Sequence, residues 1–439
     1  MKKISVLFFA LLISSSAFSQ SVLNLLGKSQ DFFKLMSEEK YNEAYGFFDA
    51  SFQAKVPEAN LKEIWLKIGE KLGKYESGSV VSSKSEGEYF TVVVEVAFTN
   101  DVQPFLLAFN KSEKMVGFFL RPKATEAAYL PPAYSDTTLY KETEIHVKSG
   151  KHSLVGLLTE PKKGTNYPIV VLVHGSGPND MDATYGPNKP LKDIALGLAS
   201  KGVASIRYVK RTMLYPVEFN GAFTVKEEVM DDALAAVALA RTLPKADKKQ
   251  IYVLGHSLGG MLAPRFPLLA PDLKGIIMVA APARKLSDMI IEQNKYLFAL
   301  SNDTTQAVKQ QLDTVLKEYS KGYISKLTPP MKADSLLAGL PASYWIDLNV
   351  NNQVAAAKKI VKQRVYIAQG DNDYQVTTTD FNLWKAALGA KKNVTLKLYP
   401  QMNHMLSIQP AKSTPQEYQV HASVAEILVT DISNWIKAK

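Results

Sequence analysis

The sequence predicts an α/β fold, a mostly parallel sheet with helices on both faces, preceded by a small α+β domain. From residue 138 onward, short apolar runs alternate with helical stretches, which fits strands buried on both faces of a parallel sheet. Before that point, helical spacings give way to strand-like runs. The chain has 439 residues, 46% hydrophobic and 21% charged, a composition that excludes a disordered or collagen-like chain. Its length favours two or three domains.

Cysteine is absent from the chain, which excludes a thiol nucleophile, a disulfide scaffold and a cysteine-ligated zinc or iron–sulfur site. The net charge of +10 comes from 52 basic and 42 acidic residues that are mixed along the sequence. Because no long block of lysine and arginine occurs, the sequence does not indicate binding to nucleic acid. Nothing in it calls for a metal or an organic cofactor.

The N-terminus has the pattern of a cleavable signal peptide. Two lysines precede an apolar run over residues 4–13, and Ala17 and Ser19 then supply small side chains. Cleavage is expected before Gln20, so that residues 1–19 form the signal and the mature protein is secreted or periplasmic. A membrane anchor is the alternative, but the run is about half of the roughly 20 residues that a spanning helix needs.

A small α+β domain is predicted over residues 20–123. Apolar residues recur at helical spacing over 22–73, and three strand-like runs follow at 89–96, 105–109 and 115–120. Helices followed by an antiparallel meander are similar to the cystatin-like and NTF2-like domains that precede hydrolases in some secreted bacterial proteins. That resemblance names no catalytic residue. A proline-containing linker is expected over 124–137.

The second domain is predicted over residues 138–439. Its apolar strand-like runs lie at 169–173, 203–206, 251–254, 276–279 and 365–368. The interval between the last two runs is far longer than the others and has a helical pattern. We interpret about 285–350 as a helical insertion that caps the pocket at the sheet edge.

The sharpest local motif of the sequence is a serine in a glycine-rich stretch. The run Gly255-His256-Ser257-Leu258-Gly259-Gly260 directly follows the predicted strand 251–254 and opens a helical stretch. Glycines on both sides let a strand and a helix approach closely, which leaves the serine hydroxyl exposed above the helix N-terminus. A coincidental glycine-rich turn is the alternative, and the strand context favours a nucleophile.

A serine hydroxyl needs a general base to become a useful nucleophile. A Gly-x-Ser-x-Gly turn between a strand and a helix resembles that of the α/β-hydrolases, and this resemblance implies that the acid and then the base follow the serine in the chain. Of the six histidines, only His404 and His421 lie after Ser257. His404 follows the strand-like run 394–399, whereas His421 lies in a stretch, 416–435, that we predict as the final helix. His404 is therefore the predicted base.

The predicted acid lies in the loop that follows the strand-like run 365–368. Asp373 occupies a Gly-x-x-Asp position there, Asp371 is its rival, and Asp380 is a further alternative. The acid would fix the tautomer of His404 and stabilise the imidazolium ion. A turn in which the aspartates cap their own backbone is the non-catalytic interpretation.

Two backbone amides are expected to receive an oxyanion. One belongs to Leu258, the residue after the nucleophile. The other should come from the loop after the strand-like run 169–173, which reads His174-Gly175-Ser176-Gly177. We predict the Ser176 amide, with Gly175 and Gly177 as alternatives, and an ordinary tight turn is the non-functional interpretation.

These four ordered motifs resemble those of the α/β-hydrolase superfamily over about two-thirds of the chain. Within the superfamily, the stretches 174–180, 188–190, 207–211 and 373–376 resemble secreted bacterial esterases related to the serine aminopeptidase and dienelactone hydrolase branches. Ser257 stands where true dienelactone hydrolases have cysteine, so their activity does not carry over. The resemblance implies a secreted serine hydrolase that cleaves carboxylic esters through an acyl-enzyme.

Two other functions use the same features. A serine aminopeptidase or amidase that acts on short peptides would need an acidic group for the substrate amine, and Asp288, Glu292 and Glu318 are candidates without a feature that selects one. A non-catalytic binding protein on a hydrolase scaffold is the alternative of another class. Its working part would be the N-terminal domain, whose partner the sequence does not identify.

Four residues outside the predicted Ser257, His404 and Asp373 are candidates for contact with a substrate. Arg207 and Lys210, with the neighbouring Arg211, follow a predicted strand whose end faces the site, and they are candidates to bind a substrate carboxylate. Internal pairing is the favoured alternative, with three aspartates as candidate partners: Asp180, Asp182 and Asp193. Tyr374, beside Asp373, is a further candidate for contact with a substrate.

Overall fold

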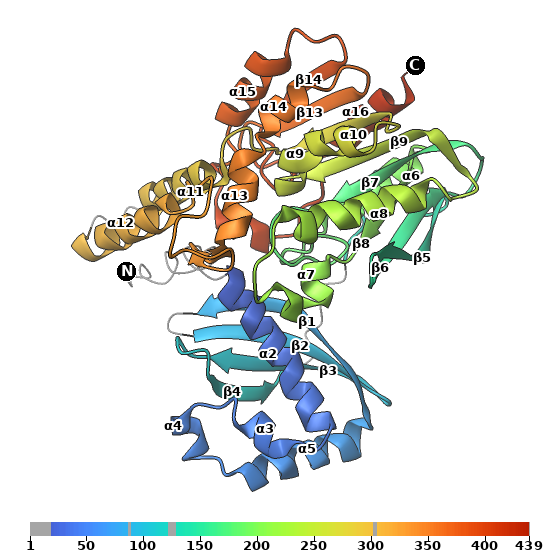
Figure 1. Ribbon diagram of the computed structural model, residues 1–439. Coiled ribbons are helices and arrows are strands. Elements are labelled where there is room, and N and C mark those ends of the chain that lie inside the picture. The colour runs from blue at the N-terminus through green and yellow to red at the C-terminus, as the bar shows by residue number, and fades with distance from the viewer. Residues whose placement is uncertain (1–18, 87–88, 122–128, 302–304, 439) are drawn as a thin grey trace.

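The structure is a computed structural model that describes residues 19–86, 89–121, 129–301 and 305–438 (Figure 1). The predicted signal peptide therefore lies outside the described residues except for its last position. The last two residues of the predicted α+β domain, 122–123, and the first part of the predicted linker, 124–128, also lie outside them. No helix of the described part is both long and apolar enough to cross a membrane. No group of three His, Asp or Glu side chains in that part is arranged to hold a metal ion.

In the described residues, the N-terminal part contains four helices and an antiparallel sheet. The helices are α2 (Ser19–Ser37), α3 (Tyr41–Tyr45), α4 (Ala50–Gln53) and α5 (Glu58–Leu72). The strands, in sheet order, are β1 (Tyr75–Glu86), β2 (Tyr89–Phe98), β3 (Val102–Phe109) and β4 (Met115–Leu120). The apolar side chains of α2 and α5 pack against the sheet, where Phe33, Trp65 and Phe105 form part of an aromatic core.

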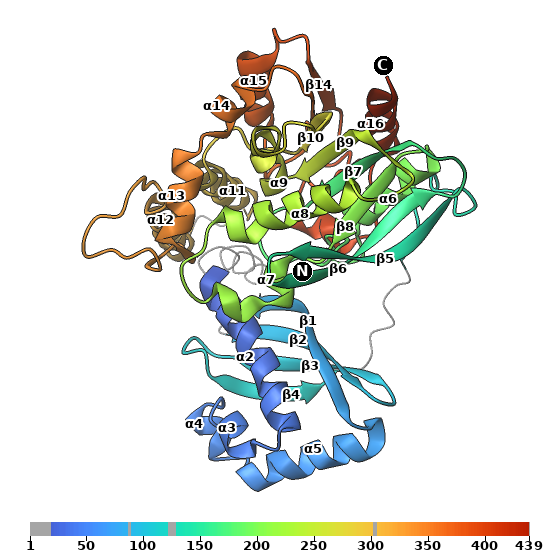
Figure 2. The same ribbon diagram turned by 45° about the vertical axis from the view of Figure 1, so that its right-hand side comes forward.

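Helix α2 also reaches the second domain. It packs against the 3₁₀ turn η1 (Pro216–Phe219) and the short strand β12 (Leu340–Pro341), and its upper end lies beside them in two views (Figures 1 and 2). Leu25 and Leu26 are buried in the apolar cluster that also contains Phe219. The two parts of the chain thus share buried apolar surface, which favours a fixed arrangement.

An eight-stranded sheet forms the centre of the second domain, in the order β14-β13-β10-β9-β7-β8-β6-β5. Its strands are β5 (Tyr140–Ser149), β6 (His152–Pro161), β7 (Tyr167–Val173), β8 (Ala204–Tyr208), β9 (Ala246–His256), β10 (Gly275–Val279), β13 (Arg364–Gly370) and β14 (Val394–Tyr399). The six strands from β14 to β8 are parallel, and the hairpin β5–β6 adds an antiparallel edge.

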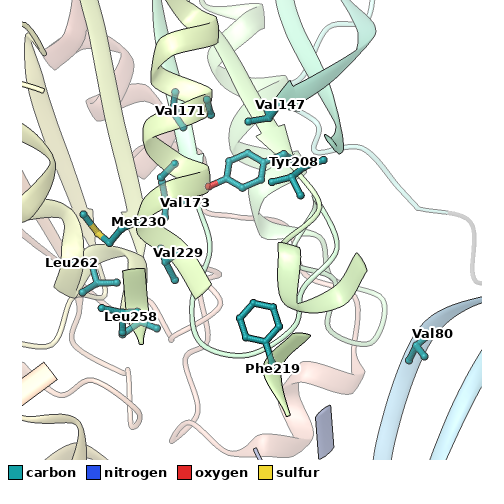
Figure 3. Packing of buried hydrophobic residues seen from close by; sticks show 14 of the residues in the cluster. Val80, Val147, Val171, Val173, Tyr208, Phe219, Val229, Met230, Leu258 and Leu262 are labelled. Carbon is teal, nitrogen blue, oxygen red and sulfur yellow. The ribbon is translucent and has the colours of Figure 1, made fainter. Parts of the chain in front are cut away.

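Alternate residues of the central strands pack into two apolar clusters, one on each face of the sheet. Val170 and Leu172 of β7 pack with α6 (Pro190–Ser200) and α16 (Glu426–Lys437) on one face. Val171 and Val173 face the other side, where α8 (Asp231–Ala240) and α15 (Thr378–Leu388) lie. Figure 3 shows these two valines in the cluster that also contains Met230 and Leu258. Strands buried on both faces explain the continuous apolar runs in the sequence.

The insertion separates β10 from β13. It contains α11 (Leu286–Ser301), α12 (Gln306–Ser320), the two-residue strands β11 (Leu336–Leu337) and β12, then α13 (Ala342–Val350) and α14 (Gln353–Lys358). Helices α11 and α12 lie side by side and extend away from the sheet (Figure 1).

Two stretches that the sequence predicts as helical, 416–435 and the segment after Ser257, are not single regular helices in the structure. The final helix begins at Glu426 and not near 416, so His421 lies in the loop before it, and the prediction is wrong at that end. The segment after Ser257 is broken into α9 (Leu258–Leu262), the 3₁₀ turn η3 (Ala263–Arg265) and α10 (Phe266–Leu269). Pro264 and Pro267 lie in this segment, and proline disrupts the regular helical hydrogen bonds.

Candidate active site

Ser257 occupies the sharp turn between β9 and α9. Its backbone has φ 55° and ψ −119°, a conformation that side chains other than glycine rarely adopt. The turn is fixed by the Ser257 N–H, which donates to the Val279 carbonyl at 3.0 Å. A Cβ at Gly255 would overlap the Gly259 carbonyl, and a Cβ at Gly259 would lie 2.6 Å from the Val173 carbonyl oxygen. The glycines therefore let the turn close over the end of β7.

His404 and Asp373 form a buried pair in the loops after β14 and β13. Nδ1 of His404 lies 2.8 Å from Oδ2 of Asp373, and both residues are about 5% exposed or less. Oδ1 of Asp373 accepts the amides of Gln375 at 2.8 Å and Val376 at 2.9 Å, and the Gln369 amide donates to Oδ2 at 3.2 Å. A carboxylate held by this many donors keeps one orientation and so fixes the imidazole.

The two rival aspartates have other partners. Oδ1 of Asp371 accepts the Gln401 amide at 2.6 Å in an exposed turn. Asp380 is fully buried and accepts the amides of Ala283 at 2.8 Å and Arg284 at 3.0 Å. The pairing in the structure therefore favours Asp373 over both alternatives as the partner of the imidazole.

The loop that carries His404 is fastened to the residue beside Ser257. Nε2 of His256 donates to the His404 carbonyl at 2.9 Å, and the two imidazole centres lie 4.8 Å apart. Within the described part of the chain, no hydrogen bond joins Oγ of Ser257 to the His404 ring. Such bonds are often long before substrate binds. The structure thus brings the two residues to the same edge of the sheet, and the relay between them stays a prediction.

Sequence reasoning assigned no role to His256. Burial, reinforced by the neighbouring His404, lowers its pKa to about 4, so its ring is neutral at pH 7 and Nε2–H is available as a donor. Its position before the nucleophile was visible in the sequence. Its hydrogen bond to the His404 carbonyl was not visible, because that carbonyl belongs to a loop 148 residues away in the chain.

The low pKa of His256 predicts that acid destabilises the fold. An unfolded histidine binds a proton near pH 6.5, whereas His256 in the folded chain does so near pH 4. Its contribution is complete above pH 6.5 and is lost as the pH falls toward 4, by up to about 3 kcal/mol. Urea unfolding of the wild type between pH 7 and pH 5 should show this fall. His256→Gln keeps an amide donor and should show a shallower fall, and equal slopes would contradict the assignment.

The loop after β7 lies against Ser257. A Cβ at Gly175 would lie 3.3 Å from the Ser257 Cβ and 3.7 Å from its Oγ. The Gly177 amide donates to Oε1 of Glu228 at 2.9 Å and is therefore engaged. Among the described residues, the amides of Gly175, Ser176 and Leu258 have no hydrogen-bond acceptor. This argues against Gly177 as an oxyanion donor and leaves Gly175 as an alternative to the predicted Ser176.

The predicted substrate contacts are instead paired inside the protein. Arg207 is 0% exposed and donates to Asp182, Thr159 and Glu142, each at 2.7 Å. Lys210 is 2% exposed and donates to the Gly175 carbonyl at 2.9 Å and to Glu228.

Arg211 pairs with Asp232 in the same way. Tyr374 is stacked between Tyr296 at 5.2 Å and Tyr418 at 6.3 Å and is buried. Internal pairing, the favoured interpretation, is thus what the structure shows for Arg207 and Lys210, and the ring of Tyr374 lies between two other tyrosines. Asp182 is a predicted partner, whereas Glu228 and Asp232 were not predicted.

Comparison with known proteins places this architecture in a family. Esterase EstD of Thermotoga maritima is 33% identical over 405 residues, which cover 92% of this chain and 93% of that protein. The chain belongs to the EstD family of α/β-hydrolases. It is therefore a hydrolase, and the predicted fold class and superfamily are confirmed. The serine aminopeptidase S33 family matches residues 220–410, and a family of unknown function, DUF3887, matches residues 29–118.

Several solved structures are similar in fold. Acylaminoacyl peptidase of Pyrococcus horikoshii aligns at 14% identity with a TM-score of 0.49, over 82% of this chain and 56% of that one. A putative dipeptidyl aminopeptidase IV of Bacteroides ovatus aligns at 16% identity with a TM-score of 0.45, over 82% of this chain and 43% of that one. Est1E of Butyrivibrio proteoclasticus aligns at 16% identity with a TM-score of 0.43, over 67% of this chain and 99% of that one. The chain thus spans less than two thirds of the two peptidases.

Proposed function

We propose that the protein is a secreted serine esterase that cleaves carboxylic esters through an acyl-enzyme intermediate. The observation that carries the proposal is the placement of Ser257 at a strained strand-to-helix turn, beside a loop in which His404 is bonded to Asp373. Strained backbone at an exposed nucleophile is typical of this reaction class. The resemblance to an esterase over nearly the whole chain supports the same chemistry.

The geometry supports the following reaction. Oγ of Ser257 attacks the ester carbonyl carbon, and Nε2 of His404 takes the hydroxyl proton. The carbonyl oxygen becomes an oxyanion that accepts hydrogen bonds from the amides of Ser176 and Leu258. The intermediate then collapses, the C–O bond to the alcohol breaks, and His404 returns the proton to the leaving oxygen. Water repeats the sequence and releases the acid, while Asp373 holds the imidazole and stabilises its charged form.

Peptide hydrolysis by the same residues is the second candidate, which the match to the serine aminopeptidase family supports. The three proposed anchors for a substrate amine have protein partners, however. Glu292 pairs with Arg284, the Tyr323 hydroxyl donates to Asp288, and Glu318 pairs with Lys321. An anchoring carboxylate would first have to leave its partner, and this favours an ester over a substrate with a free amine.

A substrate panel tests the proposal. Purified protein should hydrolyse short-chain aryl esters, release little product from aminoacyl anilides, and react covalently with a fluorophosphonate at Ser257, located by peptide mass spectrometry. Faster turnover of aminoacyl anilides would establish the peptidase instead. If the protein shows neither turnover nor labelling, a binding protein becomes the better description.

Export is a separate part of the proposal and is supported by the sequence of residues 1–19. The mature protein should begin at Gln20 when the full chain is expressed in a bacterial host with a periplasm. Intact mass measurement of the periplasmic fraction tests this, and a full-length cytoplasmic product would contradict it.

A further inference from the structure

Outside the proposed triad, the buried carboxylate of Glu228 connects the loop after β7 with Lys210 and with Tyr344. Glu228 is 4% exposed, and its Oε1 accepts the Gly177 amide at 2.9 Å and Nζ of Lys210 at 2.6 Å. Its Oε2 accepts the Tyr344 hydroxyl at 2.6 Å. A buried carboxylate with a paired cation and two further donors is satisfied and strongly oriented.

Lys210 holds the peptide that precedes Ser176, whereas Glu228 holds the peptide that follows it. Its Nζ donates to the Gly175 carbonyl at 2.9 Å as well as to Glu228. The Gly175 carbonyl and the Ser176 amide belong to one planar trans peptide, so they point in opposite directions. Holding the carbonyl on Lys210 therefore turns the Ser176 N–H away from Lys210. The next peptide, which carries the Gly177 N–H, is held directly by Glu228.

This arrangement acts on the peptide next to the nucleophile. A Cβ at Gly175 would lie only 3.3 Å from the Cβ of Ser257, so this part of the loop lies beside the proposed nucleophile. The ion pair of Lys210 and Glu228 thus orients two consecutive peptides at the place where the oxyanion would form. Donors that are oriented before the reaction stabilise the transition state without a cost of reorganisation.

The local backbone and the insertion both contribute to the position of Glu228. Glu228 lies in a π-helical turn, η2 (Lys226–Met230), just before α8, and such turns occur frequently at functional sites. Tyr344 belongs to α13 of the insertion and is 1% exposed. The neighbouring Ser343 donates to the Phe223 carbonyl at 2.8 Å, so α13 is fastened beside this turn. The insertion therefore helps to hold the carboxylate.

We propose that Glu228 is a positioning residue for the oxyanion site: with Lys210 and Tyr344 it holds the Gly175–Gly177 loop so that the Ser176 amide faces the reacting carbonyl. Glu228 touches no substrate in this arrangement and acts only through the loop. The inference rests on the proposed function and adds to it a cause for the orientation of the oxyanion donor.

Glu228→Gln keeps the size of the side chain and removes the charge that pairs with Lys210. We expect kcat for an aryl ester to fall about 10²-fold, the usual effect of losing one oxyanion donor. The affinity for a trifluoromethyl ketone, which forms a tetrahedral oxyanion on Ser257, should fall by a similar factor. KM should change less than about threefold, because the donor acts in the transition state and not in the bound ester.

Glu160→Gln is the matched control. Glu160 is also a buried carboxylate, with Tyr167 and Lys141 as partners, but Tyr167 begins β7 at the edge of the sheet opposite to Gly175. Its replacement should lower Tm as Glu228→Gln does and leave kcat and inhibitor affinity unchanged. A purely structural role would instead give both variants the same kinetic profile.

Tyr344→Phe provides a second test that spares the ion pair. Loss of one hydroxyl bond to Oε2 should lower kcat about fivefold. Unchanged kcat and ketone affinity in Glu228→Gln overturn the inference, as does a loss confined to KM. If Glu228→Gln does not fold, unchanged kcat in Tyr344→Phe overturns it. A wild type without ester turnover and without fluorophosphonate labelling overturns the proposed function itself, whereas an active wild type with unchanged variants overturns only the role of Glu228.

Discussion

Ser257→Ala is expected to lower kcat for an aryl ester by about 10⁴-fold or more and to abolish labelling by a fluorophosphonate. In the proposed mechanism the hydroxyl oxygen of Ser257 forms the acyl-enzyme, and alanine has no group that could replace it. KM should change little, because alanine leaves the backbone amides in place. Stopped-flow and steady-state assays with a p-nitrophenyl ester give both constants.

The fold of this variant must be shown to be intact. Ser257 has a positive φ that alanine tolerates no better than serine, so Tm should remain close to that of the wild type. Ser320→Ala, at the exposed end of α12, is the matched control and should keep full activity. Wild-type turnover by Ser257→Ala would show that the nucleophile is another residue.

The parallel strands could be predicted because burial on both faces leaves a continuous apolar run. Four of the five runs found in the sequence lie within β7, β9, β10 and β13, and the fifth, 203–206, begins one residue before β8. The hairpin of β5 and β6 was not predicted. Most residues of β5 are exposed, so the strand Tyr140–Ser149 is mainly polar and gives no such run. Its place at the edge is set by pairing with β6, which is a tertiary effect.

The catalytic candidates were accessible from sequence because local rules specify each of them. Glycine spacing marks the turn of Ser257, and the loops after the strands leave few choices for Asp373 and His404. The partners of Lys210 were not accessible in this way. Glu228 lies 18 residues from Lys210, and Tyr344 lies 116 residues from Glu228, so only the packing of η2 and α13 brings them together. In the sequence, a charged residue that follows a strand gives the same pattern whether its side chain binds a substrate or pairs with a buried carboxylate.

Asp373→Asn is expected to lower kcat by about 10⁴-fold, as for the corresponding change in other serine triads. Oδ1 of Asp373 accepts two backbone amides, from Gln375 and Val376, so the oxygen of an asparagine would remain at that position. Its NH₂ group would then face Nδ1 of His404, which must become an acceptor. The ring proton moves to Nε2, and this tautomer cannot take a proton from Ser257.

Asp371→Asn separates this assignment from its rival. Asp371 is exposed, accepts the Gln401 amide and belongs to the same loop, so its replacement should change kcat less than about threefold if Asp373 is the acid. A large loss in Asp371→Asn together with an active Asp373→Asn would move the role of acid to Asp371. The 2.8 Å pair of Asp373 and His404 would then be a structural contact of the loop.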